Sequence, residues 1–296
     1  MNNIIKTIYS LPPRTVIRKF RQKLLGNSSH VFCLEDIVGS PKHMRAQRGF
    51  DFLNRYQSIL KRHLKWEELN FKDKHVLEIG SGPLLGWAPL SILMGCQSYT
   101  CVEPMFNPAV LGSDIIIEKY FLPLYKDINA LYDSGISFKQ FIGSLKKRVN
   151  IEKKELLEAQ LINSFDITLS NSCLEHISHL YKNLAKLKSV SSFNNRFIHL
   201  VDLGNHRGTR NPFEGMYTMN PEAYYSKYGK NINLLRASDI QSLFDKAGFK
   251  TSMTLYYSFK DLYNEKISPY WSDKYKEEEL FMKTVIITEQ TESKGL

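Results

Sequence analysis

The sequence predicts an α/β fold, in which helices cover a mostly parallel β-sheet. From residue 75 onward, short runs rich in β-forming residues alternate with helical runs, as parallel strands with crossover helices require. The first of these runs ends in Gly80-Ser81-Gly82, a glycine turn that can join a strand to a helix. With 296 residues, 43% of them hydrophobic, the chain can form one large domain with a buried core.

The segment 1–70 is expected to be a helical extension. Residues 14–25 combine five basic residues with apolar residues at helical spacing. Such a helix could contact an anionic membrane surface, or it could pack on the core with a solvated basic face, and we favour the second interpretation. A further helix is expected over residues 44–65, where it would cover the start of the sheet.

The main domain is expected at residues 71–290. Its strands are predicted at 75–79, 99–103, 165–170 and 196–202, with two closing strands at 251–258 and 281–289. Before the closing pair, Ser238 and Gln241 form a capping-box pattern, and Gly248 ends the helix. Insertions are expected near 106–160 and 203–236, and residues 291–296 are expected to form a flexible tail.

The net charge of +10 does not by itself predict a nucleic-acid partner. The basic residues are scattered, with no run of five, and no zinc-finger or RNP-type motif occurs. The four cysteines form no C-x-x-C pair, which favours a reducing, cytoplasmic location. No signal peptide is expected, and the longest apolar stretch, residues 83–96, is shorter than the roughly 20 residues that a spanning helix needs.

Two carboxylates accompany the glycine turn. Glu78 lies two residues before Gly80, and Glu103 ends the next predicted strand, 21 residues after Gly82. A carboxylate at this spacing can accept hydrogen bonds from both hydroxyls of a ribose. Glu78 would repel a pyrophosphate and suits a ligand with an amino group or another positive charge. A dehydrogenase that binds a dinucleotide is therefore disfavoured, and Leu85 also replaces the third glycine of the dinucleotide fingerprint.

Several segments resemble motifs of the class I methyltransferases that use S-adenosylmethionine. Residues 78–82 (EIGSG) resemble the first motif, and residues 101–104 (CVEP) resemble the second, whose acid binds the ribose. Residues 165–177 resemble the fourth-strand motif, and the predicted helix from residue 238 with the last two strands resembles the C-terminal portion. The resemblance extends over residues 75–290.

The resemblance implies a Rossmann-like fold with a seven-stranded sheet, its last strand antiparallel and helices on both faces. It implies S-adenosylmethionine as the cofactor, bound at the carboxyl ends of the first two strands. The residues carried over by position are Glu78, Gly80, Ser81 and Gly82 beside the methionine part, Glu103 at the ribose with Pro104 after it, and Asn171 and Ser172 at the end of the fourth strand. Leu84 stands where the family often has a third glycine. Glu152 is one candidate for the acid at the adenine amino group, although a solvated helix face over 152–155 is the favoured interpretation.

Polar residues after the strand at 196–202 indicate where an acceptor would bind. Asp202 and His206 lie where α/β folds place substrate chemistry. A hydroxyl acceptor must lose a proton, so one of these residues could act as a base, or both could brace the loop. His176 is a third candidate for catalysis, and for it we favour a role in fixing a turn. Aromatic residues of the 203–236 insertion could cover a substrate or stack on a sugar or aryl ring.

The leading hypothesis is an O-methyltransferase that acts on a small-molecule or glycan acceptor, because such insertions resemble those of enzymes that modify polysaccharides and natural products. An N-methyltransferase acting on an amine or natural product is the alternative, and a non-catalytic subunit that binds the cofactor is a further one. No metal is expected, because no histidine and carboxylate residues have a recognisable ligand spacing. The sequence identifies neither the acceptor nor the oligomeric state.

Overall fold

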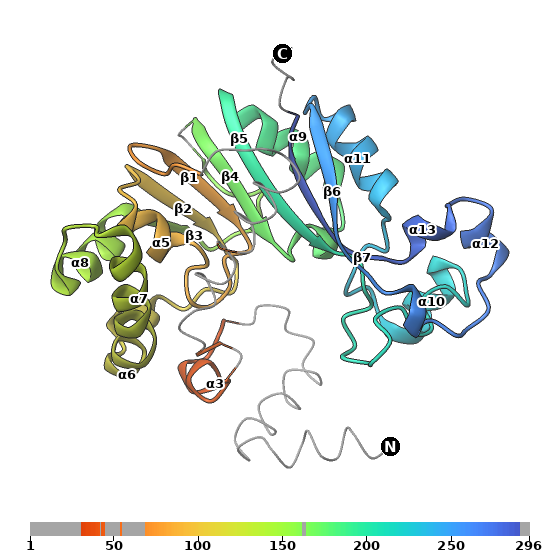
Figure 1. The fold of residues 1–296 in the computed structure, drawn as a ribbon, viewed down its shortest axis with the longest axis horizontal. Helices are drawn as coiled ribbons and strands as arrows, with labels where there is room; N and C mark the ends of the chain where they lie inside the picture. The colour runs from red at the N-terminus through yellow and green to blue at the C-terminus, as the bar shows by residue number, and fades with distance from the viewer. Residues whose placement is uncertain (1–30, 42, 45–53, 55–68, 162–163, 291–296) are drawn as a thin grey trace.

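The computed structural model describes residues 31–41, 43–44, 54, 69–161 and 164–290. At its centre is a seven-stranded sheet with the strand order β3-β2-β1-β4-β5-β7-β6 (Figure 1). The strands are β1 (His75–Ile79), β2 (Ser98–Val102), β3 (Val149–Glu152), β4 (Phe165–Asn171), β5 (Ser191–Asp202), β6 (Thr251–Ser258) and β7 (Met282–Glu289). Strands β1 to β5 are parallel, whereas β7 is antiparallel to both β5 and β6. The prediction of a Rossmann-like sheet with an antiparallel last strand is confirmed.

All six strands predicted from the sequence are present, and the prediction missed β3. This strand has four residues and follows helix α8 (Phe138–Arg148) directly, so no turn residues mark its start. Strand β5 begins five residues earlier than predicted. Its first residues are mostly polar and lack the apolar alternation by which a strand is recognised.

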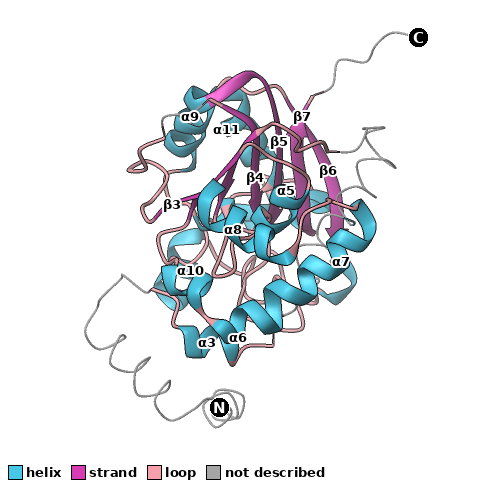
Figure 2. Cartoon of the chain, turned by 90° about the vertical axis from the view of Figure 1, so that its left-hand side faces the viewer, coloured by secondary structure: helices cyan, strands magenta, loops and turns pink. Residues whose placement is uncertain are grey.

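Helices cover both faces of the sheet (Figure 2). Helices α5 (Ala88–Leu93), α7 (Leu122–Tyr132) and α8 pack on one face, and α9 (Leu180–Val190) and α11 (Ala237–Lys246) pack on the other. Successive residues of β1 alternate between the two cores, with Val76 in the first and Leu77 and Ile79 in the second. This alternation decides which side chains of β1 face α5.

The segment predicted as an insertion near residues 106–160 is mostly helical. Before α8 it contains η2 (Pro108–Gly112), α6 (Asp114–Ile116), the π-helical turn η3 (Ile117–Phe121) and α7. The side chains of Phe121, Leu124 and Phe141 from this segment join the first core. The connection therefore completes the cover of one face of the sheet.

The segment 203–236 and the β6–β7 connection together form a lobe beside the sheet (Figure 1). The lobe contains α10 (Pro221–Tyr228), η5 (Lys260–Leu262), α12 (Pro269–Ser272) and α13 (Glu277–Leu280). It has its own core of ten buried residues: Phe213, Met216, Tyr217, Tyr224, Ile232, Leu234, Trp271, Tyr275, Leu280 and Phe281. Because Phe213, Tyr217 and Tyr224 are buried there, the prediction that these aromatic residues cover or stack on a substrate is wrong.

Helix α11 starts before the predicted cap at Ser238. The backbone N–H of Arg236 donates a hydrogen bond to Asp239 Oδ2 (2.9 Å), so Asp239 provides the capping carboxylate. The predicted pair of Ser238 and Gln241 lies two residues too late. Gly248, with φ of 86°, follows the last turn as predicted.

Little of the segment before the sheet is described. The predicted helix at 14–25, with its membrane or core contact, and the tail at 291–296 lie outside the described residues, and of 44–65 only residues 44 and 54 are described. The described part includes α3 (Leu34–Val38) and, just before it, Phe32, whose N–H donates to Met105 O (2.8 Å). Within the described residues, no helix has the length and apolar character needed to cross a membrane.

Candidate active site

The glycine turn follows β1 and packs against the end of β4. Gly80 has φ of 73°, and a Cβ atom there would lie 2.6 Å from Cys173 Sγ, so only glycine fits. Its N–H donates to Val102 O (2.9 Å). Because β1, β2 and β4 are parallel neighbours, the residues at their carboxyl ends, including Glu103 and Asn171, meet at one edge of the sheet.

Glu103 is held in place by the backbone of two loops. Its Oε2 accepts a hydrogen bond from Gly82 N–H (2.8 Å), and its Oε1 accepts one from Met105 N–H (3.2 Å). Burial raises the pKa of Glu103, while these two N–H groups oppose the increase. Each carboxylate oxygen has a further lone pair. Glu103 can therefore accept two more hydrogen bonds without losing those that position it.

Glu78 does not occupy the position that the sequence predicts. Its Oε2 accepts hydrogen bonds from the Tyr99 hydroxyl (2.6 Å) and Trp87 N–H (3.1 Å), and the residue is 1% exposed. Strand alternation explains the error, because position 78 faces α5, as Val76 does. Glu78 therefore braces the turn from behind and does not line the cavity described below. Gly86 is required here, since a Cβ atom would lie 2.1 Å from Glu78 Oε2.

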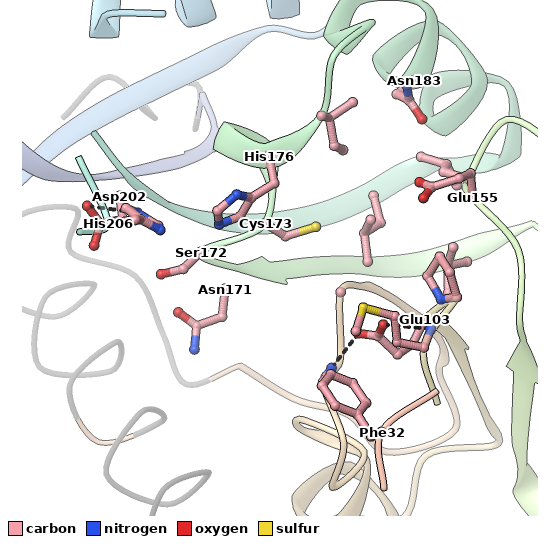
Figure 3. Close-up of a pocket in the computed structure, with 18 of the residues that line it drawn as sticks. Phe32, Glu103, Glu155, Asn171, Ser172, Cys173, His176, Asn183, Asp202 and His206 are labelled. Carbon is pink, nitrogen blue, oxygen red and sulfur yellow. Dashed lines mark hydrogen bonds and ion pairs between the residues drawn. The ribbon is translucent and has the colours of Figure 1, made fainter. Parts of the chain in front are cut away.

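A cavity of about 910 Å³ opens at the carboxyl ends of the strands (Figure 3). It is lined by six of the eight predicted cofactor residues: Gly80, Gly82, Glu103, Pro104, Asn171 and Ser172. Ser81, like Glu78, does not line it. Figure 3 shows Glu103 and Glu155 on one side of the cavity and His176, Asp202 and His206 on the other. We call these two sides the glutamate end and the histidine end.

The sequence interpretation missed two residues of the glutamate end. Phe32 lines the cavity beside Met105, although it precedes the main domain in the sequence. Glu155 also lines the cavity, whereas Glu152 lies outside it and accepts a hydrogen bond from Gln160 N–H (3.4 Å). Glu152 ends β3 and residues 153–155 are not helical, so the interpretation of 152–155 as a helix face is wrong too. Glu155 follows β3 by three residues, so the missed strand is the reason why the sequence does not single out this acid.

The histidine end brings together all three predicted catalytic residues. His206 Nε2 lies 3.4 Å from Asp202 Oδ1, and the rings of His176 and His206 meet edge to face with centroids 4.8 Å apart. Lys283, which the sequence interpretation missed, forms an ion pair with Asp202. Burial acts to raise the pKa of Asp202, but hydrogen bonds from His206, Lys283 and Gly204 N–H lower this pKa below its ordinary value. Asp202 is therefore ionised at neutral pH.

Glu175 lies beneath the two histidines. It is 3% exposed, and neither carboxylate oxygen has a hydrogen-bond partner of good geometry among the described residues. His206 Nε2 lies 3.6 Å from Glu175 Oε1. Burial raises the pKa of Glu175 well above its usual range. The backbone N–H groups of Glu175 and Asp202 and the charge of Lys283 oppose this increase only in part.

No protein-family model and no curated protein matches the sequence. Solved structures of similar fold include a candidate O-methyltransferase from Nostoc punctiforme (TM-score 0.44, 12% identity, 86% of this chain and 59% of that chain covered). Phosphoethanolamine N-methyltransferase 2 from Haemonchus contortus, solved with phosphomonomethylethanolamine and S-adenosylhomocysteine, has a TM-score of 0.43 at 16% identity, over 76% of this chain and 47% of that chain. A third, the [4+2]-cyclase SpnF, has a TM-score of 0.37 at 13% identity, over 67% of this chain and 57% of that chain. Their described activities differ and the likeness is distant, so the function has to be inferred from the site.

Proposed function

We propose that the protein transfers a methyl group from S-adenosylmethionine to a hydroxyl of a small-molecule or glycan acceptor. The observation that supports this most is the single cavity, which joins the glycine turn and Glu103 at one end to the histidine cluster at the other. Methyl transfer needs this layout, because the cofactor carries the activated group and the protein has to hold the acceptor in line with it.

The glutamate end fits a nucleoside with a positive charge better than a dinucleotide. Glu103 has spare lone pairs for two ribose hydroxyls, the Gly80–Gly82 turn lets the methionine part approach the backbone, and Glu155 is placed for the adenine amino group. Among the described lining residues the one lysine or arginine is Lys283, which Asp202 neutralises at the far end. A pyrophosphate would therefore meet carboxylates instead of cations at the glutamate end.

The histidine end fits an acceptor that must lose a proton. Asp202, His206 and His176 lie within one cluster there, and any of the three could take a proton from a hydroxyl. Burial lowers the pKa of His176, so its ring is neutral and can accept a proton at neutral pH. An amine acceptor would need no such base, so this cluster favours oxygen over nitrogen as the methylated atom. A subunit without catalysis would not need the cluster at all.

Replacing Glu103 tests the cofactor assignment. In Glu103→Ala the ribose hydroxyls lose a charged hydrogen-bond partner, which costs about 1.5–3 kcal/mol, or roughly tenfold or more in affinity. Isothermal titration with S-adenosylhomocysteine would measure this loss, with NAD as the competing ligand class. Glu152→Ala is the matched control, because Glu152 is a nearby acid outside the cavity. Equal affinity of a folded Glu103→Ala protein and the wild type, or tighter binding of NAD, would contradict the proposal.

A further inference from the structure

We infer that Glu175, His176 and His206 form a binding site for a divalent transition-metal ion at the histidine end of the cavity. Each residue offers one ligand atom, and the three atoms lie within 4.8 Å of one another. Nitrogen and oxygen ligands bind such ions at about 2.0–2.2 Å, so two ligands of one ion are at most about 4.2 Å apart. The Glu175–His206 pair, at 3.6 Å, already satisfies this limit. Small rotations of the imidazole rings would complete the site.

His176 is oriented as a metal ligand usually is. Its Nδ1–H donates to the backbone carbonyl of Asn231 (2.6 Å), since a carbonyl oxygen can only accept. The proton is thereby fixed on Nδ1, and Nε2 carries the free lone pair. Histidine ligands characteristically donate their other ring N–H to a carbonyl or carboxylate, which sets both tautomer and ring orientation.

Glu175 is the carboxylate of the cluster that is free to bind an ion. The oxygens of Asp202 already accept from Gly204 N–H (2.9 Å) and pair with Lys283. Those of Glu175 are buried, and among the described residues neither accepts a hydrogen bond of good geometry. An ion would thus give these two buried oxygens a partner of good geometry.

The backbone conformation of His206 also supports this site. Its φ of 53° is left-handed, a conformation that is uncommon for a residue other than glycine. Such strain persists only where the surrounding structure imposes it, and it is concentrated at functional sites. Here it directs the imidazole toward Glu175 and Asp202 instead of away into solvent.

A set of two imidazoles and one carboxylate favours Zn²⁺, Mn²⁺ or Fe²⁺, whereas Mg²⁺ and Ca²⁺ prefer oxygen ligands. Such a site leaves positions open toward the cavity, where the ion could lower the pKa of a bound hydroxyl. In that case Nε2 of His206 is a ligand and not a base. The sequence-based expectation that no metal is involved overlooked this cluster, because His206 lies about thirty residues after the Glu175-His176 pair.

The test is metal binding by the full chain, without a polyhistidine tag and after removal of metal with a chelator. Titration with Co²⁺, followed by its visible absorption, should show one saturable site per chain, and calorimetry should show Zn²⁺ binding at least 100-fold more tightly than Mg²⁺. Glu175→Gln keeps the side-chain volume, and His206→Asn keeps a residue that tolerates positive φ. Each should weaken Co²⁺ binding by about 100-fold or more, beyond the 10–100-fold that loss of an outer-shell partner costs.

His179→Ala is the matched control, because His179 is an exposed histidine three residues after His176. It should bind Co²⁺ as the wild type does. The competing explanation is an ion cluster in which a protonated His206 is shared by Glu175 and Asp202. That explanation predicts no saturable Co²⁺ site, or unchanged affinity in folded Glu175→Gln and His206→Asn, and either result would overturn the metal site. The titration contains no S-adenosylmethionine, so its failure and the failure of the proposed methyl transfer are independent.

Discussion

Glu78 and Glu103 lie at the ends of neighbouring strands, yet their carboxylates face different surroundings. Glu78 is enclosed between the glycine turn and Tyr99, and burial raises its pKa from 4.5 to about 7, with hydrogen bonds from Tyr99 and Trp87 acting against the increase. In the unfolded chain the same carboxyl has its ordinary pKa. The native state therefore holds the proton of Glu78 more tightly than the unfolded state does.

This difference predicts a pH-dependent stability. Since the folded pKa is raised, the contribution of Glu78 is fully present below pH 4.5 and is lost as the pH rises to about 7. At about 1.4 kcal/mol per pKa unit, the free energy of unfolding should fall by about 3 kcal/mol over this window. Glu78→Gln, which cannot ionise, should not show this fall.

Urea denaturation of both proteins at pH 5 and pH 8 measures the effect. The comparison with Glu78→Gln is needed because Glu175 also has a raised pKa. Glu175 contributes to the pH dependence of both proteins, so the difference between them isolates Glu78. A stability difference between the two proteins that is the same at both pH values would show that Glu78 is ionised at an ordinary pKa.

Helix α11 illustrates, at the scale of an element, how a cap can also be a tertiary contact. Asp239 Oδ2 accepts hydrogen bonds from Arg236 N–H (2.9 Å) and from the Tyr275 hydroxyl (2.6 Å), and Oδ1 pairs with Lys274 (3.1 Å). The same carboxylate thus closes the helix and attaches it to the lobe. Ser238, the cap predicted from the sequence, donates its backbone N–H to Glu279 Oε1 (2.7 Å), and within the described residues its side chain makes no hydrogen bond of this kind.

Asp239→Ala should therefore lower the free energy of unfolding by about 1–2 kcal/mol, at the upper end of the cost of losing a cap. Ser238→Ala should change it by less than about 0.5 kcal/mol, as surface substitutions usually do. Thermal or urea denaturation of the two variants beside the wild type gives the comparison. A larger loss of unfolding free energy in Ser238→Ala than in Asp239→Ala would show that Ser238 is the cap, as the sequence predicts.

The elements with a strong local pattern were predictable, and those fixed by tertiary contacts were not. Strand β1 agrees with the prediction at both ends, because a short apolar run leads directly into glycine. Strand β3 has no boundary in the sequence and is recognised only by its pairing with β2. In the site, the residues of β1, β2 and β4 could be placed from motifs, whereas Phe32 and Lys283 arrive from distant segments. Composition also could not show that Tyr217 belongs to a core and not to a lid.

At the scale of the whole molecule, a buried arginine holds the lobe to the sheet. Arg236 is 1% exposed, and its Nη1 donates to Leu203 O (2.9 Å) and to the Tyr217 hydroxyl (2.8 Å). Tyr217 in turn donates to Leu280 O. One chain of hydrogen bonds thus connects the end of β5 to the β6–β7 connection.

Tyr217→Phe breaks this chain and leaves Leu280 O without its donor and Arg236 with one acceptor fewer. The expected cost is about 1–3 kcal/mol of unfolding free energy, as for other buried groups that lose their partner. Tyr225→Phe, on helix α10 and half-buried, is the control and should cost less than about 0.5 kcal/mol. Denaturation curves, with limited proteolysis of residues 203–236, would show whether the lobe loosens. If both variants are equally stable, the arginine network does not hold the lobe.

The separate core of the lobe has a consequence for how the protein can change over evolutionary time. The glutamate end of the cavity is built on β1 and β2, whereas the histidine end is completed by the loop that leads from β5 into the lobe. Substitutions inside the lobe can reshape one end of the cavity while the packing beneath Gly80 and Glu103 stays intact. Under the function proposed above, a lineage could therefore acquire new acceptors by exchanging this one module, and its cofactor preference would be inherited unchanged.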